Sequence, residues 1–236
     1  MNDKTYSVFN AMTDIIASPG KALGEVKQHT SWLWWPLLIS VALAMGVFAY
    51  YYSWVDFPWL VEETIRGIPA ENRAESAEAI RQFMKPGQTM WITLISILVI
   101  TFIIYLIQAV YFHLANKMTS GAEIGFGQWF SFSVWISFIN IFGSLAALAM
   151  ILMADSNQLA STSLQPLSLN ALLLHASPGD TWHTWASSLS LLSFWTIFLA
   201  ATGFGRWTGA STVKSWVIAA LPWVLIFGIW AALKAL

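Results

Sequence analysis

Few side chains in this sequence are of the types that catalyse reactions or bind metal ions. The chain has four histidines and no cysteine, which excludes disulfides, thiolate nucleophiles and cysteine-based metal sites. The only grouping that resembles a ligand set is His175, Asp180 and His183, whose imidazole and carboxylate groups are zinc ligand types. Their spacing matches no strong metal motif, and the neighbouring Trp182 and Trp185 favour a segment at a membrane interface. A metal site is the less favoured of these two interpretations.

The common signatures of enzymes do not occur in the sequence. There is no His-Glu-x-x-His and no Gly-x-Ser-x-Gly, and the long apolar runs contain no carboxylate that could serve as a buried acid. Residues 121–127 are rich in glycine around Glu123, but they lack the Gly-Lys-Ser/Thr of a phosphate-binding loop. We therefore expect neither an enzyme nor a bound cofactor.

Small and polar residues recur at intervals of three or four in several apolar runs. Residues at this spacing share one face of a helix. Such a face allows two helices to approach closely and to hydrogen-bond, or it lines a path for a solute. The sequence leaves both interpretations open. This candidate polar seam consists of Gln108, Asn116, Ser133, Ser137, Asn140, Ser144, Ser193 and Thr196.

Five long apolar runs must position these side chains. They cover 109 of the 236 residues and contain none of the 11 Lys and Arg or the 12 Asp and Glu. A helix of roughly 20 apolar residues crosses a hydrocarbon core about 30 Å thick. A charge at its centre costs roughly 2.5–3.5 kcal/mol, which explains the exclusion. The runs predict an all-α polytopic bundle with five transmembrane helices, at about 34–55, 91–114, 129–153, 187–205 and 215–233.

Many of the 15 tryptophans lie at the ends of these runs. Indole is apolar but carries one N–H donor, so it favours the boundary between membrane and water. The tryptophans expected there are Trp34, Trp35, Trp54, Trp91, Trp129, Trp182, Trp185, Trp207 and Trp216. Those inside the runs are expected to pack or to face lipid: Trp135, Trp195, Trp223 and Trp230.

The distribution of basic residues favours a cytoplasmic N-terminus and an outer C-terminus. The connection 154–186 contains no Lys or Arg, which favours the outer side, although the connection 56–90 carries four. The N-terminus lacks a signal peptide, so the first run must itself direct insertion. A net charge of −1 gives no reason to expect nucleic acid as a partner.

The segments outside the runs include short amphipathic helices. Residues 5–17 and 19–26 are each predicted to be helical, with Ser18 as N-cap and Pro19 at the first helical position. A further helix is predicted at about 69–85, on the outer surface, and a helical turn at 168–175. We thus divide the chain into a cytoplasmic segment, 1–30, and one membrane domain, 31–236.

Three stretches of the sequence resemble the bacterial branch of the Ypt-interacting protein (YIP) family. The first runs from Asp14 to Leu23 and continues at Trp34–Leu37; the second is Phe112–Phe130; the third is Leu192–Gly203. The resemblance implies five spans, a cytoplasmic N-terminal segment and no reaction. The positions that carry it, and that are candidates for facing a partner, are Asp14, Pro19, Pro36, Gly121, Glu123, Gln128, Trp195 and Gly203.

The chain departs from the family pattern in two places. Bacterial relatives often have a proline midway along the third span, where this chain has Ser137 and Phe138. The Asp-Leu-Tyr-Gly-Pro-like segment of eukaryotic members is missing, which argues against their role in vesicle traffic and Rab GTPase binding.

Together these features predict a non-enzymatic protein of the bacterial inner membrane that organises partner proteins or lipids. Its expected partners are the lipid bilayer, membrane or cytoplasmic proteins, and a second copy of the chain. The alternative is a small-solute or ion channel or transporter, which would use the polar seam between the second, third and fourth spans.

Overall fold

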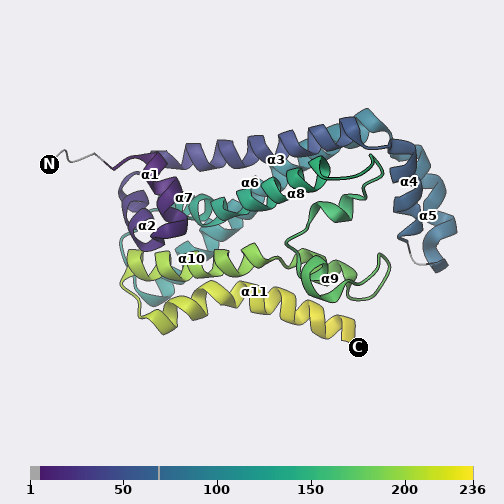
Figure 1. Cartoon of the computed structure of the whole chain (residues 1–236). Helices are drawn as coiled ribbons and strands as arrows, with labels where there is room; N and C mark the ends of the chain where they lie inside the picture. The colour runs from purple at the N-terminus through teal and green to yellow at the C-terminus, as the bar shows by residue number, and fades with distance from the viewer. Residues whose placement is uncertain (1–5, 69, 236) are drawn as a thin grey trace. The chain divides into compact units, whose positions relative to one another are not determined.

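The computed structural model describes residues 6–68 and 70–235, and these residues form helices with a single β-bridge between Ser168 and Ser190 (Figure 1). The all-α prediction is confirmed. In chain order the helices are α1 (Val8–Ala17), α2 (Pro19–Gln28), η1 (Thr30–Leu33), α3 (Trp34–Trp54), α4 (Phe57–Arg66), α5 (Ala70–Phe83), α6 (Pro86–Thr119), α7 (Phe126–Ser137), η2 (Phe138–Asn140), α8 (Ile141–Leu152), η3 (Ser161–Leu164), η4 (Asn170–Leu174), α9 (His183–Ser188), α10 (Leu191–Thr208) and α11 (Thr212–Ala235).

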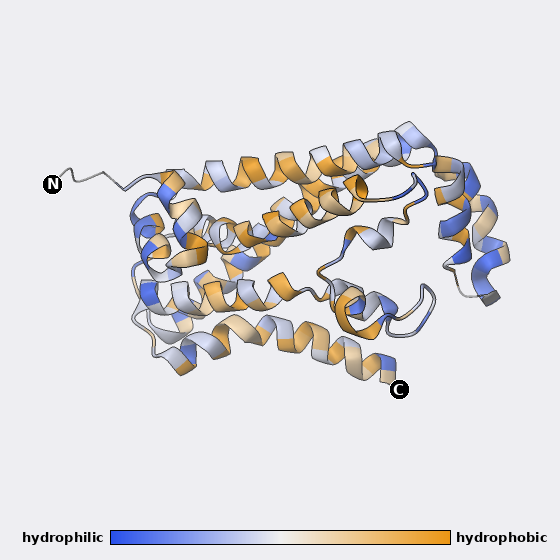
Figure 2. Cartoon of the chain, viewed as in Figure 1, coloured by the Kyte–Doolittle hydropathy of each residue, from blue (hydrophilic) through white to orange (hydrophobic). Residues whose placement is uncertain are grey.

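Four helical segments in the described part of the chain are long and apolar enough to cross a membrane: Thr30–Trp54, Pro86–Thr119, Phe126–Leu152 and Thr212–Ala235. These correspond to four of the five expected spans, and Figure 2 shows their largely hydrophobic residues. The expected fourth span at 187–205 instead falls on α9 and α10. The two helices are separated at Leu189 and Ser190, because Leu191 N–H donates to the Leu167 carbonyl there. This break leaves α10 with only 18 residues.

The expected third span is continuous in the sequence but not a uniform α-helix. A short 3₁₀ segment, Phe138–Asn140, separates α7 from α8. The segment follows Ser137, whose carbonyl accepts a hydrogen bond from the Asn140 amide. A change of helical type inside a span leaves backbone carbonyls for side chains to bind.

The connection between α3 and α6 holds two helices, whereas only one is predicted from the sequence. Asp56 caps α4 by accepting a hydrogen bond from Trp59 N–H, and Pro58 lies in its first turn. The expected helix 69–85 is α5, and Pro86 begins α6 rather than only ending the preceding helix. The predicted turn at 168–175 is the five-residue η4.

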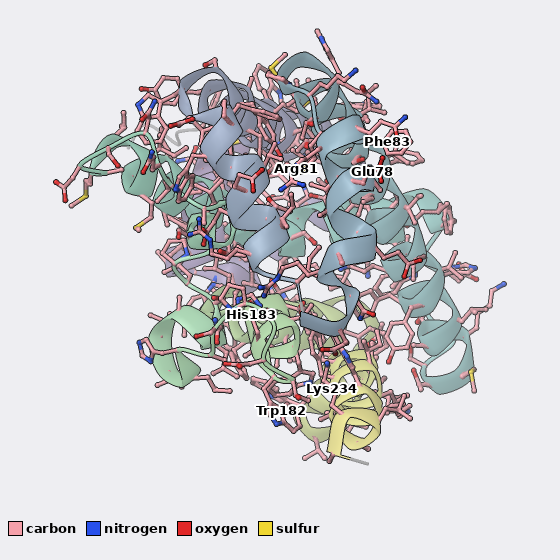
Figure 3. All side chains as sticks on the ribbon, turned by 90° about the vertical axis from the view of Figure 1, so that its right-hand side faces the viewer. Glu78, Arg81, Phe83, Trp182, His183 and Lys234 are labelled. Atoms are coloured by element: carbon pink, nitrogen blue, oxygen red, sulfur yellow. The ribbon has the colours of Figure 1, made fainter. Side chains whose placement is uncertain are left out.

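The chain folds into two compact units, each assembled from several separate segments. Unit 1 comprises residues 1–40, 100–140 and 192–229, and unit 2 comprises 41–99, 141–191 and 230–236. In unit 2 an apolar core forms around Tyr51 and Ile151, and α4 packs on it through Leu60 and Ile65. In Figure 3 Arg81 lies on the side of α5 that faces α4, where it pairs with Glu62, whereas Phe83 points away.

Candidate functional site

The first feature of the site is an ion pair between the two N-terminal helices of unit 1. Ser7 begins α1 with a capping box shared with Asn10, and Pro19 occupies the first position of α2. Lys21 Nζ lies 3.1 Å from Asp14 Oδ2 and 4.5 Å from the ring centre of Tyr6. The bond from Lys21 lowers the pKa of Asp14 below its usual value. Burial and the bond to Asp14 raise the pKa of Tyr6.

Ser18 lies at the N-cap position of α2, as expected, but its side chain makes no capping hydrogen bond. Its carbonyl accepts from Lys21 N–H and Ala22 N–H instead. The start of α2 is therefore set by Pro19 and by the backbone of Ser18, and this turn brings Lys21 to Asp14.

Three side-chain hydrogen bonds to main-chain carbonyls fasten α2 to α7 and α10 (Figure 1). Trp207 Nε1 donates to the Leu23 carbonyl at 2.7 Å, and Lys27 Nζ donates to the Trp207 carbonyl at 2.7 Å. Gln128 Nε2 donates to the Lys27 carbonyl at 3.0 Å, while its Oε1 accepts from Gly125 N–H. The carbonyls of Lys27 and Trp207 lie in the last turns of α2 and α10, where carbonyls have no partner within the helix, so two of these bonds satisfy groups that would otherwise need water. Together these bonds fix the position and the rotation of α2 relative to α7 and α10.

Gly203 allows α10 to approach α2 and α7 closely. A Cβ atom at this position would lie 2.9 Å from Leu23 Cδ1 and would overlap the ring of Phe132. Only a residue without a side chain fits there. Gly203 is one of the positions that the family resemblance singled out, and its role in the fold is this helix contact.

Aromatic rings from three helices pack together beneath α2. Phe112 of α6 contacts Trp129, Phe132 and Phe204 at ring-centre distances of 5.1–6.2 Å, and Trp207 lies 5.4 Å from Trp129. Trp129 is 0% and Trp207 2% exposed. Both indoles are thus buried in the core of unit 1 and are not exposed on its surface. Other expected boundary residues are exposed on the protein surface: Trp34, Trp35, Trp91 and Trp216.

Asn116 shapes the turn that leads from α6 into α7. It is 2% exposed, its amide donates to the Ala122 carbonyl, and its Oδ1 accepts from the Ser120 hydroxyl. Gly121 has a φ of 62°, a left-handed conformation that glycine adopts readily. Glu123 is exposed. This glycine-rich stretch thus serves a tight turn.

The polar seam residues of unit 1 are mostly buried, and their hydrogen bonds go to neighbouring helix groups. Ser133 and Thr196 each donate to the carbonyl four residues earlier, and Ser137 donates to Gln108 Oε1 at 3.3 Å. Asn140 is exposed and Ser193 is buried. Ser144 belongs to unit 2. Of these three bonds, the one from Ser137 joins two helices, α7 and α6, and the other two stay within one helix.

The remaining predicted residues have simpler surroundings. Pro36 is buried in the first turn of α3, and Trp195 is 39% exposed and contacts Phe198. The described residues contain no group of three His, Cys, Asp or Glu side chains that could hold a metal ion.

His175, Asp180 and His183 therefore do not form such a group. His175 takes a left-handed conformation, with its Nδ1 3.1 Å from the Leu173 carbonyl. Asp180 accepts from Ser177 N–H. The local turn thus uses these polar groups in hydrogen bonds to its own backbone.

A comparison with family models matches residues 13–233 to the Yip1 domain. The chain belongs to the Yip1 domain family. The resemblance to the YIP family is thereby confirmed, and with the apolar helices it identifies an integral membrane protein. No curated protein and no solved structure matches the chain.

Sequence reasoning missed three residues of this site: Lys27, Trp207 and Arg206. Lys27 and Trp207 form two of the bonds that fasten α2, and Arg206 lies beside Gly24 of the same helix. Trp207 and Lys27 are 180 residues apart, so no local pattern connects them. The sequence did offer one signal. Trp207 is followed by Thr208 and Gly209 at the end of an apolar run, which is typical of a helix C-terminus whose last carbonyls need hydrogen-bond donors.

Proposed function

We propose that this chain is a non-enzymatic membrane protein that organises partner proteins or lipids through the helix pair α1–α2. The observation that carries the proposal is the set of bonds from Trp207, Lys27 and Gln128, which hold α2 at a defined place on unit 1. A surface held in one orientation loses little conformational entropy when a partner binds. The Yip1 domain family implies no reaction, which agrees with a binding role.

The exposed side of α1 carries both apolar and polar side chains. Phe9 and Ile16 are 59% and 42% exposed, and the ring of Phe9 lies 5.5 Å from that of Trp35. Apolar side chains beside an interfacial tryptophan suit the boundary of the bilayer. Asn10 and Thr13 are exposed and polar, and Thr13 lies between Phe9 and Ile16 on the same face of the helix. We assign this mixed face to a protein partner that binds at the membrane surface.

The membrane arrangement that goes with this function has α10 as a fifth span and the N-terminus in the cytoplasm. At 1.5 Å per residue the 18 residues of α10 extend about 27 Å, close to the thickness of a hydrocarbon core. The absence of Lys and Arg from 154–186 supports an outer location for that connection. With five spans the C-terminus is outside, and the location is the bacterial inner membrane.

Site-specific photocrosslinking in native membranes tests the proposal. A photoreactive residue in place of Thr13 on α1 should give a discrete adduct, and the matched control replaces Glu75 on α5, which is also exposed. Deletion of residues 1–28 removes Thr13, so in that variant the photoreactive residue is placed at a second position. The deletion should abolish capture of the same partner there. Identical adducts from the two positions, or capture that survives the deletion, would overturn the proposal.

A flux assay separates this function from the channel alternative. Under the organising role, Asn140→Leu leaves solute flux through proteoliposomes unchanged and alters only thermal stability. If the polar seam is a conduit, Asn140→Leu blocks flux while deletion of 1–28 leaves it intact. The hydrogen bonds of Ser133 and Thr196 to their own helices support the first outcome.

A further inference from the structure

Two pockets of unit 1 meet at Gly20 and Arg206, which line both. The first has a volume of about 530 Å³ and is lined by Lys21, Lys27 and Glu25 in addition to the shared pair. The second has a volume of about 440 Å³ and runs between α2, α10 and α11, with Phe198, Ala201 and Trp216 among its lining residues. A polar pocket therefore continues directly into one with apolar walls.

The polar pocket carries an excess of positive charge. Lys21, Lys27 and Arg206 line it, against the single carboxylate of Glu25. Lys21 pairs with Asp14, and Lys27 uses one N–H on the Trp207 carbonyl. Arg206 forms no ion pair with a carboxylate in the described part of the chain, and its guanidinium retains its donors for a ligand. A guanidinium binds phosphate oxygens through two parallel N–H groups.

Glycines keep the entrance between α2 and α10 open. A Cβ atom on Gly20 would meet Thr202 Cγ2 at 3.8 Å, and one on Gly24 would meet Arg206 Nε at 3.4 Å. Both positions could carry a small side chain, so the helix contact alone does not require glycine at Gly20. Gly20 also lies in the first turn of α2, where the positive end of the helix dipole favours a negative charge.

We infer that these two pockets form a binding site for one anionic phospholipid. The phosphate binds Arg206 with help from Lys21 and Lys27, and an acyl chain lies along Phe198 and Trp216, whose rings are 6.2 Å apart. A free phosphate would satisfy the cations but would leave the adjoining apolar walls empty. The inference names a lipid ligand for the proposed organising function. It rests on that function only for the biological purpose of the site.

Native mass spectrometry of the full chain in mild detergent tests the site. The chain is incubated with phosphatidylglycerol or with phosphatidylcholine of the same acyl chains. We expect one retained phosphatidylglycerol and several-fold less phosphatidylcholine. Arg206→Gln removes a charge-assisted bond and should lower phosphatidylglycerol retention about tenfold. The matched control Lys117→Gln, at an exposed lysine in the last turn of α6, should change nothing.

A second variant tests the shape of the site without altering its charge. Gly20→Leu should fill the junction of the two pockets and abolish lipid retention, while the helical circular dichroism stays that of the wild type. Excess inorganic phosphate should not displace the bound lipid. Displacement by phosphate, equal retention of the two lipids, or equal losses in Arg206→Gln and Lys117→Gln would overturn the inference. If Arg206→Gln or Gly20→Leu loses the lipid but still crosslinks its partner at Thr13, the lipid site is separate from the protein-binding role.

Discussion

Each of the two compact units carries a pair of short helices, and the pairs are held by different interactions. In unit 1, α2 buries Leu23 and Val26 completely and is in addition bound through its main chain, by Trp207 and Gln128. In unit 2, α4 is held mainly by apolar burial, and its link to α5 includes the exposed ion pair between Glu62 and Arg81. Directional bonds from buried groups define one orientation, whereas apolar burial tolerates small rotations. This difference supports the proposal that α1–α2 is the specific binding surface.

The largest expected effect comes from a single added methyl group. Gly203→Ala should destabilise unit 1 by about 1–3 kcal/mol, because the new Cβ overlaps Phe132 and crowds Leu23. The matched control is Gly228→Ala in α11, where a Cβ meets no atom within 4 Å. That change should be neutral or stabilising, since alanine favours helix by up to about 1 kcal/mol. Thermal unfolding in detergent measures both, and equal shifts in melting temperature would contradict the close contact at Gly203.

An intermediate effect is expected from removing one hydrogen bond. Trp207→Phe removes the 2.7 Å bond to the Leu23 carbonyl, at a cost of about 0.5–1.5 kcal/mol for one hydrogen bond. Trypsin should then cleave faster after Lys21 and Lys27, because α2 separates from α10 more often. Trp195→Phe, at a half-exposed indole, is the control and should not change the cleavage pattern. Cleavage of Trp207→Phe at the wild-type rate would show that the bond does not hold α2.

The smallest effect is that of the surface ion pair at Asp14, and it depends on pH. The pKa of Asp14 is lowered from 3.8 by Lys21, so the ionised carboxylate stabilises the folded state. This stabilisation is complete above about pH 4 and is lost as pH falls through the lower folded-state pKa. At pH 7 Asp14→Asn should cost about 0.2–1 kcal/mol, the usual range for an exposed pair. The difference in melting temperature from wild type should shrink as the pH falls below about 4, and a difference that does not depend on pH would contradict this assignment.

The helical class, four of the membrane helices and the start of α2 were predictable from the sequence because each depends on local composition. The signal for α4 is also local, since Asp56 and Pro58 follow the same rule that identified Ser18 and Pro19. The helix was nevertheless missed, because a short segment of mixed apolar and charged residues is also typical of a connection. The shortness of α10 arises from Leu167, a partner 24 residues before Leu191, which no local pattern indicates.

The candidate site was harder to predict than the fold. Gly203 and Gln128 were selected from the family resemblance, and the structure gives each a contact with α2 or its carbonyl. The burial of Trp129 and Trp207 was not predictable from the sequence, because indole at the end of an apolar run suits the membrane boundary and the bundle core equally well. The choice between them for Trp129 and Trp207 depends on rings from α6 and α10 that meet only in the folded unit.

Hydrogen exchange of the full chain in lipid nanodiscs tests the central claim most directly, which is that α2 is a fixed part of unit 1. We predict that the amides of residues 21–28 in α2 exchange much more slowly than those of the exposed, polar α5. We further predict that Gln128→Leu and Trp207→Phe accelerate exchange in α2 and leave α5 unchanged. Exchange of α2 as fast as α5 in the wild type would contradict the account.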